Sequence, residues 1–211
     1  MFSIYLLRHG QTDYSATNRF CGDLDPPLNA TGQEMAACFA REHAQLAWRA
    51  VYSSPSLRTR QTAAALANAI SLPVQGSPGM REISYGRWEG LSHDEARRRD
   101  PDHYAWWAQD PTSRGAPEGE TAFHMAARAV PALEEIRSAH PEGPVLLVSH
   151  KATIRVLICA LLGIDVRLYR DRFDYPVAAV TCVEFKERGP FFRSIADTSH
   201  LPPHLRNLPG T

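Results

Sequence analysis

Two continuous apolar runs, each closely followed by a histidine, constrain the fold of this chain most strongly. Phe2 to Leu7 leads into Arg8 and His9, and Val145 to Val148 is followed closely by His150. Apolar runs of this length are typical of short strands buried inside a sheet. In an open α/β sheet, the carboxyl ends of the strands are where ligand-binding groups gather. We therefore expect the two histidines to lie at a binding edge of the sheet.

Predicted helices and further short strands separate the two runs, which indicates an α/β fold. Capping boxes at Thr31–Glu34 and Ser92–Glu95 begin two helices, the first running to about Trp48 and the second to Arg99. The other expected helices begin at Ser54-Pro55, near Tyr104, at Glu120-Thr121 and at Lys151, and Pro131 is expected to bend the third of these. Further strands are expected at 50–53, at 73–74, and as a hairpin at 177–185 and 191–197.

Length and charge limit the class of protein. The 211 residues fit a single domain over 1–211, with a loosely held proline-rich tail at 201–211. The 23 basic and 23 acidic side chains balance, so we expect neither nucleic acid nor a membrane surface as a partner. A membrane span and a signal peptide are not expected either. The four cysteines lack Cys-x-x-Cys spacing, which favours free thiols in a reducing cytoplasm.

Five side chains on the predicted edge suit phosphoryl transfer: His9, His150, Arg8, Arg58 and Glu82. A neutral imidazole can act as a covalent nucleophile. Two arginines and a second histidine would neutralise charge on the phosphoryl oxygens, and a carboxyl group could protonate the departing alkoxide. No metal or other cofactor is expected, because the histidines lack a carboxylate-rich setting and a His-x-x-x-His helix.

Four motifs resemble, in the right order, those of the histidine phosphatase superfamily, also called the phosphoglycerate mutase-like family. They are Arg8–Thr12, Ser53–Ala63 with Arg58, Glu82–Gly90 and Val148–His150. The resemblance covers nearly the whole chain and implies a three-layer α/β/α sandwich with a mostly parallel central sheet. It also implies a phosphohistidine intermediate on His9, with Glu82 as proton donor. Arg8, Arg58 and His150 would hold the phosphoryl group.

The residues expected to bind the rest of the substrate depart in part from the family pattern. Ser15 stands where the family often has Asn, and would donate a hydrogen bond over a shorter reach. Lys151 stands where a glycine usually follows the second histidine. Its side chain either points away, which we favour, or reaches the pocket mouth and favours an acidic substrate. A loop resembling a carboxylate-binding loop (18–22) and an aromatic cap supply the other expected contacts: Arg19, Cys21, Gly22, Tyr85, Trp88, Trp106 and Trp107.

The same motifs distinguish between the possible functions. The loop 18–22 resembles that of the cofactor-dependent phosphoglycerate mutases, but the segment between Glu82 and His150 lacks their insertion. Pro117–Thr121 resembles instead the phosphatase form, Pro-x-Gly-Glu-Ser. We therefore predict a phosphatase of small phosphorylated metabolites, favouring those that bear a carboxylate, such as phosphoserine or 3-phosphoglycerate. A mutase and a non-catalytic phospho-ligand-binding protein are the alternatives, and homodimer formation is left open.

Overall fold

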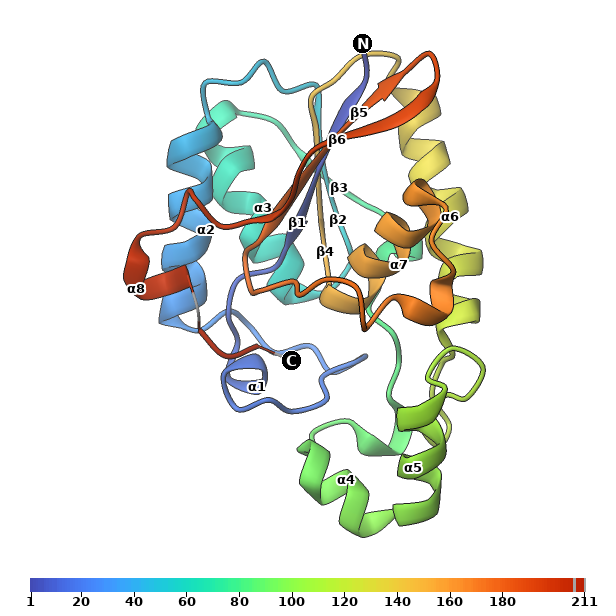
Figure 1. Cartoon of the computed structure of the whole chain (residues 1–211). Coiled ribbons are helices and arrows are strands. Elements are labelled where there is room, and N and C mark those ends of the chain that lie inside the picture. Colours follow the sequence, from blue (N-terminus) through green and yellow to red (C-terminus); the bar gives the residue numbers. More distant parts are fainter. Residues whose placement is uncertain (207, 211) are drawn as a thin grey trace.

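A six-stranded sheet flanked by helices forms the body of the molecule (Figure 1). The structure is a computed structural model and describes residues 1–206 and 208–210. The strands are β1 (Ser3–Arg8), β2 (Ala50–Ser53), β3 (Val74–Gly76), β4 (Val145–Ser149), β5 (Val180–Lys186) and β6 (Gly189–Asp197). The helices are α1 (Asp13–Ala16), α2 (Ala30–His43), α3 (Leu57–Ile70), α4 (His93–Arg99), α5 (Pro101–Gln109), α6 (Ala122–Ala139), α7 (Lys151–Leu162) and α8 (Pro203–Arg206).

The strand order places the two histidine-bearing strands next to each other. The order is β3-β2-β4-β1-β5-β6, with β3, β2, β4 and β1 parallel and β5 and β6 joined as the predicted antiparallel hairpin. Arg8 lies opposite Ser149 in the parallel register, and the His9 backbone N–H donates to the Ser149 carbonyl at 3.0 Å. His9 and His150 therefore leave the sheet at the same edge.

Helices cover both faces of the sheet. Ile4 and Leu6 of β1 pack with α6 and α7, whereas Leu7 packs with α2 and α3 on the other face. This alternation follows from the two-residue period of strand side chains. Figure 1 shows α2 and α3 on one side of the sheet and α6 and α7 on the other. The predicted three-layer α/β/α sandwich is confirmed.

A small helical cap lies beyond the carboxyl ends of the parallel strands. It comprises α4, α5 and the chain around them, and Figure 1 shows it separated from the sheet. The cap has an apolar cluster of its own, built from Phe20, Trp88, Ala96, Tyr104, Trp107 and Ala116. The aromatic residues therefore give this part a core that does not depend on the sheet.

Three predicted helix starts are wrong by a few residues, and one of them is that of α5, which begins at Pro101 rather than near Tyr104. The N-cap of α2 is Asn29, whose side-chain oxygen accepts from the Gly32 N–H at 2.9 Å, so Thr31 already lies inside the helix. The helix ends at His43, before the predicted Trp48, and the indole N–H of Trp48 donates to the His43 carbonyl at 2.8 Å. Helix α3 begins after Ser56 rather than at Ser54.

Part of the segment that is expected to be a loosely held tail packs against the body of the molecule. Leu201 and Leu205 are buried, at 1% and 3% exposure, and pack against Met35 of α2. The proline-rich composition suggested a loose segment, but these two leucines bury enough apolar surface to dock α8. Residues 207 and 211, which that prediction included, lie outside the described residues.

The four cysteines are free thiols, as predicted. In the ranges 1–206 and 208–210, the structure has no helix that combines the length and the apolar character needed to cross a membrane.

Candidate active site

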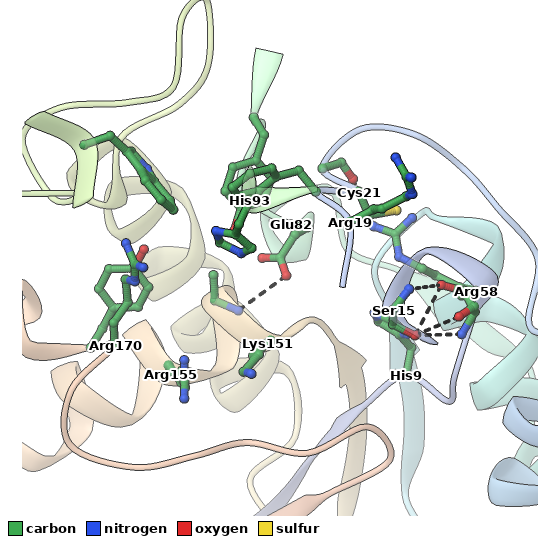
Figure 2. A pocket seen from close by; sticks show the side chains of 17 residues that line it. His9, Ser15, Arg19, Cys21, Arg58, Glu82, His93, Lys151, Arg155 and Arg170 are labelled. Carbon is green, nitrogen blue, oxygen red and sulfur yellow. Dashed lines mark hydrogen bonds between the residues drawn. The ribbon is translucent and has the colours of Figure 1, made fainter. Parts of the chain in front are cut away.

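A cavity lies at the carboxyl edge of the sheet, between the strand ends and the helical cap. Its walls include His9 after β1, Arg58 of α3 and Lys151 of α7, together with His93 and Trp107 of the cap. Figure 2 shows the labelled side chains around this space, with His9, Ser15 and Arg58 gathered at one end. The predicted binding edge therefore coincides with a cavity.

His9 is held in one tautomer by the backbone beside it. Its Nδ1 lies 2.7 Å from the carbonyl oxygen of Gly10. Because a carbonyl only accepts, Nδ1 must carry the proton, which leaves the Nε2 lone pair available. Burial, followed by the charges of Arg58 and Arg8, lowers the pKa of His9 well below its usual value. The ring is therefore neutral and nucleophilic at neutral pH.

The two arginines differ in their relation to the cavity. Arg58 lines it, and its Nη1 and Nη2 donate to the carbonyls of Leu24 and Gly22 at 2.6 and 2.9 Å. Arg8 is buried beside Tyr175, donating to that backbone carbonyl at 2.7 Å, and is not one of the residues that line the cavity. Burial lowers the pKa of Arg8 to about 10, so it remains a cation. Arg58 thus faces the cavity, while Arg8 adds positive charge behind His9.

His150 lies directly beside the His9 ring. The rings of His9 and His150 meet edge to face, with centroids 5.3 Å apart. Nε2 of His150 lies 2.9 Å from Ser54 Oγ, so a hydrogen bond fixes the ring from its other side. Burial, with the Arg58 charge next, lowers the pKa of His150 well below its usual value. A neutral second histidine is therefore fixed at the site.

Glu82 is fixed by the N-terminus of α7. Its carboxylate oxygens accept from the backbone N–H groups of Ala152 and Thr153, each at 3.3 Å, and from the Thr153 hydroxyl at 3.2 Å. Among the cavity-lining residues that the structure describes, Glu82 is the only carboxylate. Glu89 and Glu120 lie elsewhere, the first supporting the Tyr85 backbone and the second paired with Arg128.

The predicted substrate contacts near His9 are brought together, but most of their polar groups are already used. Ser15 lines the cavity, yet its hydroxyl donates to the Thr12 carbonyl at 3.0 Å. Gly22 adopts a positive φ of +51°, and its carbonyl accepts from Arg58. Burial raises the pKa of the Cys21 thiol to about 11, so the thiol that lines the cavity stays protonated at neutral pH. Burial also raises the pKa of Tyr85 well above its usual value.

Arg19 and Lys151 depart from their predicted roles. Arg19 lines the cavity, but its Nη1 donates to Glu95 at 2.7 Å and to the Gly90 carbonyl at 2.8 Å. Its guanidinium therefore forms an ion pair with Glu95 of α4. Our preferred orientation for Lys151 is wrong, because its side chain lines the cavity instead of pointing away. Its Nζ donates to the Gly210 carbonyl at 3.1 Å.

The aromatic cap is partly as predicted. Tyr85 and Trp107 line the cavity, whereas Trp88 is fully buried in the cap and Trp106 is 52% exposed to solvent. Several lining residues were not among the predicted site residues. Thr12 and Phe20 lie within the predicted motif and loop, whereas the others lie outside them: His93, Ala152, Arg155, Tyr169 and Arg170. Of these, Arg155 had a usable signal, since a residue four positions after Lys151 lies on the same face of α7.

Comparison with known proteins agrees with these motifs. Residues 4–198 match the family model of the histidine phosphatase superfamily, branch 1. Phosphoserine phosphatase 1 of Hydrogenobacter thermophilus is 30% identical over 201 residues, covering 95% of each chain.

Solved structures agree as well. YhfR of Bacillus stearothermophilus superposes with a TM-score of 0.88 at 28% identity, covering 95% of this chain and 99% of the other. Phosphoserine phosphatase of Entamoeba histolytica, solved in complex with 3-phosphoglyceric acid, has a TM-score of 0.84 at 25% identity and covers 96% and 100%. The chain belongs to branch 1 of the histidine phosphatase superfamily.

Proposed function

We propose that this protein hydrolyses small phosphate monoesters through a phosphohistidine on His9. The observation that carries the proposal is the tautomer of His9. The Gly10 carbonyl holds the proton on Nδ1, and the depressed pKa keeps the ring neutral beside Arg58. An unprotonated Nε2 next to a fixed cation suits attack on phosphorus.

The reaction takes two displacements. Nε2 of His9 attacks phosphorus, and the bond from phosphorus to the alcohol oxygen breaks as Glu82 gives that oxygen a proton. Water then attacks the phosphohistidine, Glu82 takes a proton from the water, and the N–P bond breaks. Inorganic phosphate leaves, and both side chains return to their first state. Arg58, with Arg8 and His150 behind His9, stabilises the charge that spreads over the phosphoryl oxygens.

Hydrolysis is favoured over the mutase reaction. A mutase must retain its phosphorylated donor and exclude water, and the segment between Glu82 and His150 lacks the insertion that would do so. Two of the relatives described above are named phosphoserine phosphatases. We extend the proposal to a preference for substrates that carry a carboxylate, such as phosphoserine or 3-phosphoglycerate.

The four free thiols support a reducing cytoplasm as the compartment.

The test is capture of the intermediate. Wild-type protein mixed rapidly with phosphoserine and quenched in alkali should carry phosphate that is stable in base and released in acid, whereas His9→Ala should carry none. A parallel assay for interconversion of 2- and 3-phosphoglycerate should show little transfer compared with release of inorganic phosphate. Phosphate found on a serine or aspartate would refute the mechanism. Binding without any phosphate release would favour the non-catalytic alternative.

A further inference from the structure

Three cationic side chains line the end of the cavity away from the catalytic histidine. They are Lys151 and Arg155, one turn apart on α7, and Arg170 in the connection that follows. Figure 2 shows Arg155 and Arg170 on the opposite side of the cavity from His9 and Arg58, with Glu82 between the two groups. We call Lys151, Arg155 and Arg170 the distal cluster.

The positive charge of the distal cluster exceeds the negative charge near it. Asp174 lies 3.5 Å from both Lys151 Nζ and Arg155 Nη2, but its side chain is 75% exposed, so water screens it. Arg155 and Lys151 are much less exposed, at 11% and 21%. No ion pair is found for Arg170 among the described residues. Its guanidinium instead lies 4.4 Å above the Trp107 ring.

Two hydrogen-bond donors of the distal cluster have no partner among the described residues. Nη1 of Arg170 and Nε of Arg155 are buried and have no hydrogen-bond partner among the described residues. Buried donors without partners are costly, and clustered like charges add to that cost. Burial, together with the neighbouring charges of Arg8 and Arg155, lowers the pKa of Lys151 to about 8. A bound anion would relieve both costs at once.

The alternative cation for such an anion is Arg19, and its geometry argues against that role. Its Nη1 already donates to the Glu95 carboxylate and to the Gly90 carbonyl. The aromatic wall of Tyr85, Tyr169 and Trp107 instead continues toward Arg170 and offers apolar contact for the carbon part of a substrate.

We propose that the distal cluster binds a second oxyanion of the substrate, a carboxylate or a second phosphate, while the scissile phosphate lies at His9. This inference rests on the proposed function and adds the residues that recognise the second group. The loop 18–22, which resembles a carboxylate-binding loop, then shapes the reacting end and supports Arg58 through the Gly22 carbonyl, and the Leu24 carbonyl just after the loop adds a second bond.

The first test compares substrates that differ in one group. Arg155→Gln and Arg170→Gln should each lower kcat/KM for phosphoserine by about ten- to a hundredfold, because each removes a charge-assisted hydrogen bond. The loss on phosphoethanolamine, which lacks the carboxylate, should be several times smaller. Fructose 1,6-bisphosphate against fructose 6-phosphate makes the same comparison for a second phosphate. The substrate pair between which the variants no longer discriminate identifies the second anion as a carboxylate or a phosphate.

A substitution that is expected to raise kcat/KM, rather than lower it, makes the test more specific. Asp174→Asn removes the nearby negative charge and should raise kcat/KM for the doubly anionic substrates, by about two- to fivefold for an exposed group. A merely structural defect would not raise it. Arg167→Gln is the matched control, since Arg167 is exposed and paired with Asp165 outside the cavity.

Binding separates this inference from the proposed function. In His9→Ala protein, calorimetry should show phosphoserine binding more tightly than phosphoethanolamine, and Arg170→Gln in that background should remove the difference. Equal binding of the two compounds, together with equal binding of the two fructose phosphates, would overturn the inference even if the wild type is a phosphatase. Discrimination in binding with no turnover in the wild type would overturn the proposed function and leave the inference standing.

Discussion

Arg128 of α6 holds the segment that carries the proposed general acid, and its replacement should impair catalysis selectively. Its Nη1 donates to the carbonyls of Gly79 and Arg81 at 2.8 Å each, and its Nη2 donates to the carbonyl of Glu82 at 3.0 Å. The same guanidinium forms a two-pronged pair with Glu120, at 2.8 and 2.6 Å. Arg128→Met removes all of these bonds while keeping an unbranched side chain.

The structure sets the size of the effect. Arg128 and Glu120 are each 19% exposed, so the variant leaves a mostly buried carboxylate without its partner and three carbonyls without a donor. Partial exposure moderates the cost, and we expect a loss of about 2–4 kcal/mol in the free energy of unfolding. A shift of about 1 Å in a catalytic group costs roughly a hundredfold in rate. We therefore expect kcat for phosphoserine to fall about ten- to a hundredfold.

Leaving-group chemistry provides the assay. An alkoxide needs a proton as it departs, whereas p-nitrophenolate is already a good leaving group. The fall in kcat should thus be much smaller on p-nitrophenyl phosphate than on phosphoserine, at a temperature where the variant remains folded. Adding Glu120→Gln should recover part of the stability, because the unpaired carboxylate is gone. Arg128→Lys should be intermediate, since an ammonium group cannot reproduce the planar fork.

Arg137→Met is the matched control on the same helix. Arg137 pairs with Glu134 at the surface, where such pairs contribute about 0–1 kcal/mol. It should leave both kcat values near wild type. An equal loss on the two esters in Arg128→Met, or no loss on either, would refute the claim that Arg128 acts by positioning Glu82.

Three further predictions follow from the site. Glu82→Gln should reduce turnover of alkyl phosphates far more than that of p-nitrophenyl phosphate; equal losses would limit Glu82 to a positioning role. Activity should survive excess chelator, because Arg58 and Arg8 supply the positive charge; a tenfold loss restored by magnesium, about 1.4 kcal/mol in barrier, would contradict this. Denaturant titrations should show that the free energy of unfolding decreases as the pH is lowered below about 6.5. The histidines of the unfolded chain bind protons in that range, whereas buried His9 and His150 of the folded chain do not. The slope should approach about 1.4 kcal/mol per pH unit for each histidine, and a slope of opposite sign would contradict the assignment.

The sheet and its edge were predictable from the sequence because local pattern and tertiary structure agree there. Phe2–Leu7 is apolar except for Ser3, Val145–Val148 is apolar throughout, and such runs are typical of strands buried on both faces. Both lie in β1 and β4, the central parallel pair. The turn from strand to loop carries His9, so recognising the strand was sufficient to place the histidine.

Helix boundaries were less predictable because several residues can cap the same helix. Asn29 and Thr31 are both good N-caps, and the choice depends on contacts far along the chain. The Asn29 amide also donates to the Gln11 side chain at 3.2 Å, a contact that ties the start of α2 to the loop after β1. Nothing in the local pattern around Thr31 contains that information.

The distal cluster was missed for a related reason. Arginines are usually exposed, and neither Arg155 nor Arg170 belongs to a motif. Their partners come from separate parts of the fold, with Phe173 accepting from Arg155 at 2.7 Å and Trp107 lying under Arg170. Lys151 was noticed only as a departure from the family pattern, and its direction depended on the position of Asp174. Apart from the four-residue spacing of Lys151 and Arg155 on α7, only the tertiary structure brings these charges to one cavity.

The two ends of the cavity are built differently, and this difference has a consequence for function. At the reacting end, backbone groups fix the side chains: Gly10 holds His9, Gly22 and Leu24 hold Arg58, and the first turn of α7 holds Glu82. Substitution of a neighbouring side chain leaves those backbone groups in place, so the geometry for phosphoryl transfer should tolerate change nearby. At the distal end, backbone carbonyls also accept from Lys151 and Arg155. The other contacts are weaker, because Asp174 is exposed and the Arg170 guanidinium lies against an aromatic ring. Substrate preference should therefore change by single substitutions there while the chemistry at His9 is retained.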